Sequence, residues 1–362
     1  DRMLKPYLKK APPSHVMNAL RLGVIELCNG EAAHGVVNAY VEIVARNKRT
    51  QTMKGLTNAV LRKIADEGPA GWDKRAVPLT PGWLRQPLVA AWGREAVEGM
   101  EAAHFSGAPL DLTVKSDPEA VAEIVGGVVL PTGSVRIANA GQVSALPGYA
   151  DGAWWVQDAA AAIPVKLLGD VKGQKILDLC AAPGGKTMQL AALGANVTAV
   201  DVSEKRMTRV TENLSRVGLS ATVIVSDAFD LDEGGYDAIL LDAPCSATGT
   251  IRRHPDLPYA KDGSEFGELI DQQEAMLDHA LTLLKPGGRL VFCTCSLLPD
   301  EGEVQVEDAL ARHSGLTVET PSVAGIDPDW ITPEGGLRLR PDYWAELGGM
   351  DGFYMAVLRK PA

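Results

Sequence analysis

A glycine-rich segment that carries a carboxylate, a thiol and a lysine is the part of the sequence best suited to bind a ligand. It extends from Asp178 to Thr187, overlapping the end of the apolar run 175–179 and preceding an Ala/Leu-rich helical pattern. This order predicts a strand, a tight turn and the start of a helix. Because glycines at such a turn let the backbone approach a bound molecule closely, we expect this loop to contact a ligand.

The two common phosphate-binding loops do not explain this segment. Residues 185–187 match the end of the P-loop pattern G-x-x-x-x-G-K-[ST], and residues 238–242 resemble an apolar strand ending in a Mg²⁺-binding Asp. However, Cys180 stands where the first P-loop glycine belongs, and Pro183 has no N–H to offer a phosphate. The dinucleotide pattern G-x-G-x-x-G is absent as well. The sequence therefore disfavours both an NTPase and a nicotinamide-dependent oxidoreductase.

Three aspartates, Asp201, Asp227 and Asp242, stand at the carboxyl ends of predicted strands. Those strands are 196–201, 221–225 and 236–241. In an open α/β sheet the ligand crevice lies outside the carboxyl ends of the strands, so the three acids should converge there. Carboxylates can accept hydrogen bonds from ribose hydroxyls and from an adenine amino group. A single Asp in such a place is often only a turn former, but three behind a glycine loop favour a nucleoside site.

The chain has five cysteines: Cys28, Cys180, Cys245, Cys293 and Cys295. An odd number with no secretory pattern does not suggest a disulfide framework. The Cys293/Cys295 pair is not a metal site by this pattern, because no second Cys/His pair lies nearby at ligand spacing. A free cysteine commonly serves as a small buried hydrophobic residue. Cys245 and Cys295, however, each follow a strand end and precede a serine, which favours a chemical role.

Three motifs together resemble the Sun/Fmu (RsmB-type) family of S-adenosylmethionine-dependent 16S rRNA cytosine-5 methyltransferases. They are Asp-Leu-Cys-Ala-Ala-Pro-Gly-Gly-Lys-Thr at 178–187, Asp-Ala-Pro-Cys-Ser at 242–246 and Thr-Cys-Ser at 294–296. The likeness covers residues 83–359. One departure is Ala247, where the family usually has Gly, and we expect it to alter a turn. The resemblance implies methyl transfer to C5 of a cytosine in RNA, and small-subunit (16S) ribosomal RNA as the substrate.

The resemblance also implies a role for each thiol. Cytosine C5 is a weak nucleophile, so a thiolate first adds to C6, after which C5 can take a methyl group. The C5 proton then leaves and the thiolate is eliminated. By family correspondence Cys295 is the nucleophile, Cys245 assists proton removal and product release, and Asp242 is the partner of cytosine N3. A free thiol with a pKa of about 8.5 is only about 3% thiolate at pH 7, so the site must favour the thiolate.

The same correspondence implies a cofactor site for S-adenosylmethionine at the glycine loop and the strand ends, and no metal. Its residues are Cys180, Ala181, Ala182, Pro183, Gly184, Gly185, Lys186, Asp201, Asp227 and Asp242. The substrate has to be single-stranded or splayed RNA, because attack on C6 needs access to the face of an unstacked base.

A basic segment stands at the start of the chain. Residues 1–64 hold eleven Lys and Arg against four Asp and Glu, a formal charge of +7, so the remainder carries −18 of the total of −11. Such a segment can bind phosphates, although it can also be a solvated helical surface. Apolar residues recur at helical spacing, and residues 20–23 and 54–62 resemble the RNA-binding NusB-like domain of RsmB-type proteins. We expect that domain to be N-terminally incomplete here.

The predicted fold class is α/β, with three parts. Residues 1–68 are expected to form the all-α NusB-like domain. The family resemblance implies that 69–148 form a linker and a small α/β subdomain that helps hold RNA, and that 149–362 form a Rossmann-like, seven-stranded methyltransferase domain. The Gly-, Pro- and Trp-rich residues 66–81 predict a linker, and one helix is expected from Trp83 to about Ala103.

The composition is that of an ordinary globular protein, 46% hydrophobic and 22% charged. With no apolar run of about 18 residues and no signal-peptide pattern, we expect a cytoplasmic monomer that does not bind membranes. Two alternatives remain: a transfer RNA methyltransferase of the same family, and a non-catalytic RNA-binding or ribosome assembly factor that keeps the fold. Intact Cys245 and Cys295 and the Gly184-Gly185 pair argue against the second.

Overall fold

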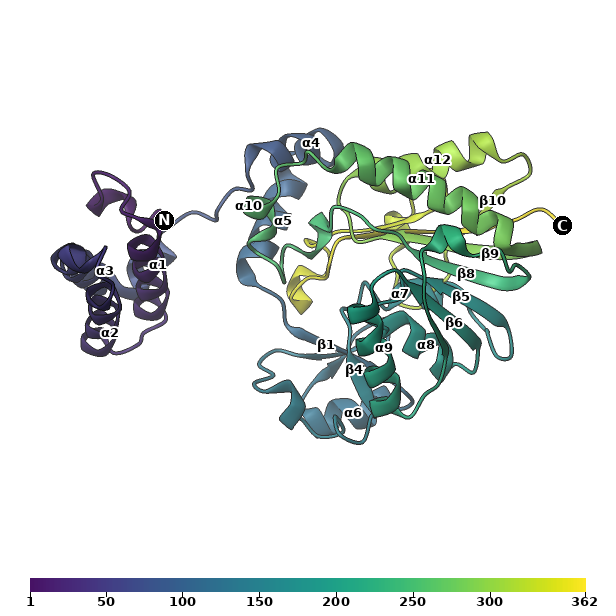
Figure 1. Cartoon of the computed structure of the whole chain (residues 1–362), viewed down its shortest axis with the longest axis horizontal. Helices are drawn as coiled ribbons and strands as arrows, with labels where there is room; N and C mark the ends of the chain where they lie inside the picture. Colours follow the sequence, from purple (N-terminus) through teal and green to yellow (C-terminus); the bar gives the residue numbers. More distant parts are fainter. The chain divides into compact units, whose positions relative to one another are not determined.

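The computed structural model describes all 362 residues of the chain. They form two compact units, residues 1–78 and 79–362 (Figure 1). Each unit has its own buried apolar core, as expected for parts that fold around separate centres. No helix combines the length and the apolar character needed to cross a membrane.

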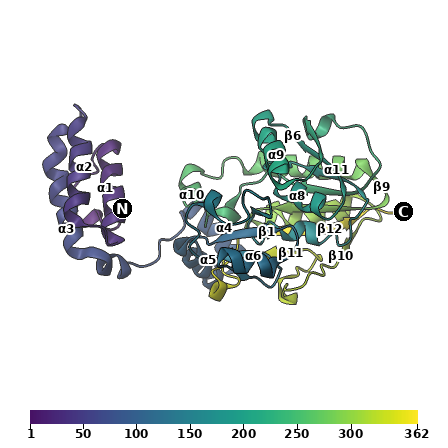
Figure 2. The same ribbon diagram turned by 90° about the horizontal axis from the view of Figure 1, so that it is seen from below.

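Three helices pack side by side in the first unit (Figure 2). They are α1 (Ser14–Cys28), α2 (Ala33–Arg46) and α3 (Lys54–Asp73). Gly23 lets α1 approach α3 closely, because a Cβ at this position would lie 2.8 Å from Cδ2 of Leu61. The helical pattern of the sequence is confirmed, since apolar residues of all three helices, such as Leu20, Tyr40 and Ile64, line the core of this bundle, although Ile43 and Leu56 are exposed.

The linker prediction for residues 66–81 is wrong in its first half. Helix α3 continues to Asp73 across a break at Gly68, which has φ 57° and ψ −159°. Glycine adopts this backbone conformation without strain, and Pro69 suits the first turn of the helical piece that follows. Trp72 packs against the core of the first unit, so these residues belong to the bundle. The compact unit ends at Pro78, beyond the boundary predicted at residue 68.

The second unit begins with two helices where the sequence predicted one. Helices α4 (Gly82–Trp92) and α5 (Arg94–Ser106) are separated by Gly93, whose φ of 80° interrupts the helical backbone. Their buried residues Leu88 and Met100 belong to one apolar cluster, which also holds Leu297 and Leu298 from the loop after the third motif.

A small antiparallel sheet follows, with the strand order β2-β3-β1-β4 and one helix. These elements are β1 (Leu110–Val114), α6 (Pro118–Val125), β2 (Val128–Val129), β3 (Val135–Ile137) and β4 (Trp154–Val156). Asp111 on β1 and Arg136 on β3 form a buried ion pair with Nε–Oδ1 2.7 Å. Trp154 and Trp155 are buried, so they pack in the core and are not free to stack on a base.

The large sheet has the order β10-β12-β9-β8-β5-β6-β7, which gives the seven predicted strands, and a short strand, β11, pairs with β12. Its strands are β5 (Lys175–Leu179), β6 (Asn196–Asp201), β7 (Thr222–Val225), β8 (Tyr236–Asp242), β9 (Leu284–Thr294), β10 (Thr317–Glu319), β11 (Leu337–Leu339) and β12 (Phe353–Arg359). Strand β12 runs antiparallel to β9.

Helices cover both faces of this sheet (Figure 1). Alternate residues of the strands point to opposite faces, so Leu177 joins one apolar cluster and Ile176 another. The cluster of Leu177 holds residues of α11 (Phe266–Leu283) and α12 (Glu303–Arg312). The opposite face of the sheet is covered by α7 (Ile163–Lys166), α8 (Gly185–Ala192) and α9 (Glu204–Val217). The short helix α10 (Leu257–Ala260) belongs to the loop after β8.

Strands β5, β6, β7, β8 and β9 are all parallel. Their carboxyl ends therefore meet at one edge of the sheet, where the segments that follow β5, β6, β8 and β9 begin. The glycine loop and the two motif cysteines lie in the segments after β5, β8 and β9. Asp201 and Asp242 are the last residues of β6 and β8, and Asp227 follows β7. The topology thus brings together, at the expected edge, residues that are more than 100 positions apart in the chain.

Candidate active site

The glycine loop is shaped by unusual backbone conformations at its two ends. Cys180 has φ 59°, and Gly184 has φ 101° and precedes the first residue of α8. A Cβ at Gly184 would lie 3.2 Å from Cγ1 of Val210, so glycine is needed both for its φ and for space. Asp178, wholly buried on β5, accepts a hydrogen bond of 2.5 Å from Oγ1 of Thr187. This bond ties the start of α8 to the strand.

Asp201 lies at the end of β6 with its side chain only 2% exposed. Its Oδ1 accepts from the backbone N of Ser203 (3.0 Å) and its Oδ2 from that of Ala182 (3.3 Å). The Arg206 guanidinium lies 3.4 Å from Oδ2 and also donates to the carbonyl of Ala182. The carboxylate is therefore held against the glycine loop by groups of three different segments.

A cavity of about 300 Å³ opens between the carboxyl ends of β5, β6 and β8. Three carboxylates, those of Asp201, Asp227 and Asp242, line it together with both motif cysteines. The full lining is Cys180, Val200, Asp201, Val202, Arg206, Ser226, Asp227, Ala228, Asp242, Ala243, Pro244, Cys245, Ala247, Gln272, Met276 and Cys295. Asp227 is exposed and accepts a hydrogen bond of 3.1 Å from the backbone N of Phe229.

A second cavity of about 440 Å³ adjoins the first. It is lined by the other loop residues of the prediction, Ala181, Ala182, Pro183, Gly185 and Lys186. Asp242 and Cys295 line both cavities. They therefore stand at the junction between a space rich in carboxylates and a space bordered by the glycine loop. Gly184 lines neither cavity and acts through the shape of the turn.

Lys186 and Asp242 form an ion pair at the junction, with Nζ–Oδ2 2.7 Å. Burial alone would lower the pKa of Lys186, but the Asp242 carboxylate outweighs it, so that the pKa lies above its ordinary value and the lysine stays charged. The other carboxylate oxygen, Oδ1, lies 3.5 Å from the thiol of the buried Cys293. Asp242 is thus fixed on both sides while its side chain keeps 31% of its surface exposed.

The Cys245 and Cys295 thiols lie 3.4 Å apart, on the loops after β8 and β9. The hydrogen bond with Cys295, together with burial, raises the pKa of Cys245 well above its usual value. Cys245 is therefore protonated near neutral pH and can donate its proton to the sulfur of Cys295. The two sulfurs are therefore close enough to exchange a hydrogen bond.

Comparison with known proteins identifies the family. Residues 165–359 match the family model described as 16S rRNA methyltransferase RsmB/F, and residues 1–66 match that of the NusB family. The chain is 36% identical over 382 residues to a ribosomal RNA small subunit methyltransferase B of Pseudomonas syringae pv. tomato, a match that covers 99% of this chain and 84% of that protein. The chain belongs to the RsmB/F family of methyltransferases.

Solved structures share the fold of this RsmB/F chain. The crystal structure of PH0851 superposes with a TM-score of 0.78 at 25% identity and covers 95% of this chain and 82% of its own. NSun6 from Pyrococcus horikoshii, crystallised with SFG, gives a TM-score of 0.67 at 19% identity over 78% of this chain and 98% of its own. The first unit is a NusB domain, and the second contains a Rossmann-like methyltransferase fold whose cofactor is S-adenosylmethionine.

The first cavity suits the nucleoside part of this cofactor. Its three carboxylates are acceptors, and the ribose hydroxyls and the adenine amino group are the donors that such acceptors bind. Apolar neighbours such as Val202 and Met276 line the space between the carboxylates, as an adenine ring requires. The chemistry of the cavity therefore fits the cofactor.

Two arginines of the loop after Asp242 differ in a way that sequence reasoning missed. The side chain of Arg252 is 0% exposed and pairs with Asp158 and Asp351. It is a structural residue. Arg253 pairs with Asp351, keeps 41% of its side chain exposed and lines the second cavity beside Cys295. Only Arg253 of the two is placed to meet a substrate phosphate.

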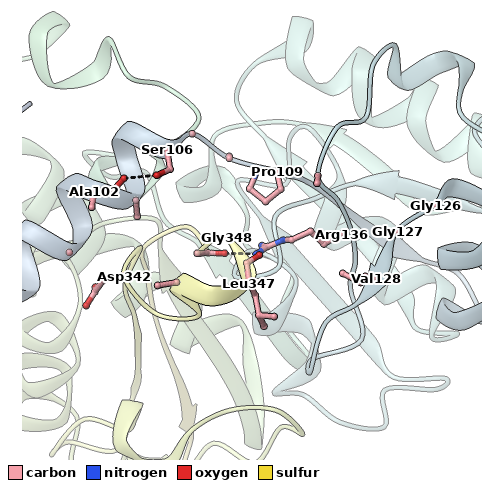
Figure 3. Close-up of a pocket in the computed structure, with 17 residues that line it drawn as sticks. Ala102, Ser106, Pro109, Gly126, Gly127, Val128, Arg136, Asp342, Leu347 and Gly348 are labelled. Atoms are coloured by element: carbon pink, nitrogen blue, oxygen red, sulfur yellow. Dashed lines mark hydrogen bonds between the residues drawn. The ribbon is translucent and has the colours of Figure 1, made fainter. Parts of the chain in front are cut away.

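A larger cavity of about 640 Å³ lies elsewhere in the RsmB/F chain, between α5, the turn before β2 and the loop before β12 (Figure 3). Its one arginine, Arg136, is engaged by the Asp111 carboxylate and by the carbonyls of Leu347 and Gly349. Asp342, its one carboxylate, is paired with Arg340. The charged groups of this cavity are thus already engaged, and none of the motif residues line it.

Proposed function

We propose that this RsmB/F methyltransferase moves a methyl group from S-adenosylmethionine to C5 of a cytosine in small-subunit (16S) ribosomal RNA, through a covalent bond between Cys295 and C6. The observation that carries the proposal is the position of Cys295. Its thiol lies at the junction of the two cavities and 3.4 Å from the thiol of Cys245. One sulfur can thus face a base while a second lies within reach of the same ring.

The first cavity would hold the cofactor through Asp201, Asp227 and Asp242, with the glycine loop bordering the rest of the molecule. Bound S-adenosylmethionine would supply an electrophilic methyl group. Asp201 is already held by backbone N–H groups and by Arg206, so little ordering is required when a ribose binds. The base would then enter from the second cavity, where Asp242 and Cys295 face it.

The chain's own residues would act in a fixed order. The Cys295 thiolate adds to C6, which places electron density on the ring and makes C5 nucleophilic. N3 would take up a proton as that charge develops, and Asp242, held by Lys186, would serve as its partner by accepting a hydrogen bond from N3–H. After C5 has been methylated, its proton would pass to a water molecule, and Cys245 would assist this removal. The electrons of the C5–H bond then re-form the C5–C6 double bond and expel the sulfur of Cys295.

Ribosomal RNA is proposed as the substrate on two grounds. The relative with 36% identity is a small subunit rRNA methyltransferase by name, and a match to the NusB family covers residues 1–66. That segment nearly coincides with the basic stretch of charge +7. Such a surface can neutralise phosphates of a folded RNA while the catalytic unit takes one splayed base. We expect the protein to act as a monomer in the cytoplasm.

The roles of the two cysteines are tested by replacing each of them. Cys295→Ala should lose methylation and form no covalent complex with RNA. Cys245→Ala should still add to the base and transfer the methyl group but should not release it, so a protein–RNA adduct should survive denaturing electrophoresis. The adduct should disappear in the double variant. Normal turnover by Cys245→Ala, or an adduct that persists without Cys295, would contradict these roles.

The substrate is tested by bisulfite mapping of total RNA from cells with and without the protein. A single protected cytosine in small-subunit rRNA that depends on Cys295 is the expected result. Protein-dependent protection confined to transfer RNA would contradict the proposed substrate but would leave the cytosine chemistry intact.

A further inference from the structure

A buried carboxylate that has no place in the mechanism above lies behind the two cysteines. Glu301 ends a short 3-10 helix, Pro299–Glu301, and is 0% exposed. Four hydrogen-bond donors surround its carboxylate, and all four belong to neutral groups. An ionised carboxylate is costly to bury unless such donors replace water, so a position of this kind indicates a specific task.

Three of the four donors come from the residues that follow the two cysteines. Ser246, next to Cys245, donates its backbone N–H to Oε1 (2.8 Å) and its hydroxyl to Oε2. Ser296, next to Cys295, donates its hydroxyl to the same Oε2 at 2.5 Å. One carboxylate oxygen therefore joins the two cysteine loops directly. Gln273 of α11 donates to Oε1 at 3.1 Å and holds the carboxylate from behind.

Further contacts of Glu301 and its neighbours strengthen this link. The Glu301 carbonyl accepts a hydrogen bond of 2.6 Å from Oγ1 of Thr294, the residue before Cys295. The hydroxyl of Thr248 lies 3.2 Å from that of Ser246 and 3.3 Å from that of Ser296. The two loops are thus connected on the side away from the cavities.

The sheet alone does not fix the distance between the two thiols. The paired residues of β8 and β9 end at Asp242 and Cys293, and beyond them the backbone hydrogen bonds between the two segments are those from Ala243 N to Cys293 O and from Gly249 N to Cys295 O, both 2.9 Å. Cys245 and Cys295 lie beyond this last pair, where each loop needs other contacts to keep its place. The Glu301 carboxylate provides a contact shared by both loops, at the residue next to each thiol.

We propose that Glu301 is a positioning residue that holds the Cys245 and Cys295 loops together and so sets the separation of their two thiols. The inference rests on the proposed function, because it is the cytosine chemistry that requires both sulfurs on one base. Displacement of a reacting group by about 1 Å can cost about 100-fold in rate. A loosened link between the loops should therefore lower the rate far more than it lowers cofactor affinity.

The electrostatic surroundings agree with this arrangement. The pKa of Cys245 is raised first by the hydrogen bond with Cys295 and by burial, and the Glu301 carboxylate raises it further. The residue that holds the thiols together thus also helps keep Cys245 as the hydrogen-bond donor of the pair.

The separation of the thiols can be measured without any turnover. Phenylarsine oxide binds two neighbouring thiols, forming two As–S bonds and releasing one water, and it binds a single thiol only weakly. The full-length protein should bind one equivalent, and Cys245→Ala or Cys295→Ala should abolish this binding. Glu301→Ala should weaken it at least about 10-fold and slow single-turnover methylation about 100-fold, as expected for displaced reacting groups. The Kd for S-adenosylmethionine should stay within about twofold, since Glu301 does not line the cofactor cavity.

Three further variants make the test specific. Glu301→Gln keeps the shape of the side chain and one acceptor oxygen, so it should restore most of the arsenical binding and of the rate. Ser296→Ala removes one of the two bridging hydroxyls with little risk to folding and should give an intermediate loss of both. Glu307→Ala, on the exposed side of α12, is the control and should behave as the unmodified protein.

Unchanged arsenical binding in a folded Glu301→Ala or Ser296→Ala variant would overturn the proposal. If Glu301→Ala does not fold, Ser296→Ala and Glu301→Gln decide the outcome. The proposed function can fail separately. If the protein methylates no cytosine C5, yet arsenical binding follows the predicted order of variants, then Glu301 holds the thiols and the reaction has been assigned wrongly.

Discussion

Replacement of Asp201 by Asn tests the cofactor site with the least disturbance of its structure. The side chain is nearly inaccessible and is held by the backbone N–H groups of Ala182 and Ser203. Asn has the same shape, and its carbonyl oxygen can still accept from one of these groups. The variant therefore removes the negative charge and one acceptor at the cavity wall without opening a void. The Arg206 guanidinium, 3.4 Å away, loses its partner but is half exposed to water.

The magnitude follows from the hydrogen bonds that the carboxylate would make. Bonds to a charged acceptor contribute about 1.5–3 kcal/mol and neutral ones about 0.5–1.5 kcal/mol, so weakening one ribose contact costs about 1–2 kcal/mol. This corresponds to a rise of about 5- to 30-fold in the Kd for S-adenosylmethionine. The ion pair with Arg206 should contribute little to stability because the arginine is solvated.

Isothermal titration calorimetry with S-adenosylmethionine and with S-adenosylhomocysteine measures this change. Both ligands carry the same ribose, so both Kd values should rise by the same factor. Asp230→Asn is the matched control, because Asp230 is exposed nearby and does not line the cavity. Thermal unfolding without ligand checks that the fold is retained. A Kd for Asp201→Asn within twofold of the unmodified protein would show that Asp201 does not hold the ribose.

Three other changes probe the rest of the structure. Burial raises the pKa of Asp178 from 3.8 to about 7, so its contribution to stability should fall as pH rises from about 4 to about 7, where only the unfolded chain is readily ionised. Chemical denaturation should show a smaller fall in Asp178→Asn, with the contribution of Asp351, whose pKa burial also raises to about 7, remaining. A Cβ at Gly249 would lie 1.9 Å from the carbonyl oxygen of Gly352. Gly249→Ala should therefore lower the free energy of unfolding by about 1–3 kcal/mol through overpacking. Gly267→Ala is the control, because a Cβ there meets no atom within 4 Å, and it should leave the free energy of unfolding unchanged or raise it in the same assay. Removal of residues 1–78 should weaken RNA binding and flatten its salt dependence, because fewer phosphates are neutralised; equal salt slopes for the two chains would contradict a role in RNA binding.

Local sequence patterns determined the main elements of the catalytic unit. The apolar runs at 175–179 and 196–201 are strands with the predicted bounds, because buried parallel strands need continuous apolar residues. Ser203, a residue type preferred at helix N-termini, caps α9, since its hydroxyl accepts from the backbone N of Arg206. The sequence predicted a linker where the last part of α3 lies, because Gly and Pro residues are typical of loops. In the structure Gly68 and Pro69 interrupt the helix, which then continues to Asp73.

The candidate site itself depended on tertiary structure. The sequence indicated that acids and cysteines stand at strand ends, and parallel pairing of β5, β6, β8 and β9 brings these ends together. The sequence could not show that Arg252 is buried while Arg253 lines the second cavity, because adjacent residues of a loop follow no periodic pattern of burial. Nor could it assign Glu301, whose partners lie 55 residues away at Ser246 and 5 away at Ser296. Such a hydrogen-bond network exists only after folding has excluded water from the group, and no local propensity encodes it.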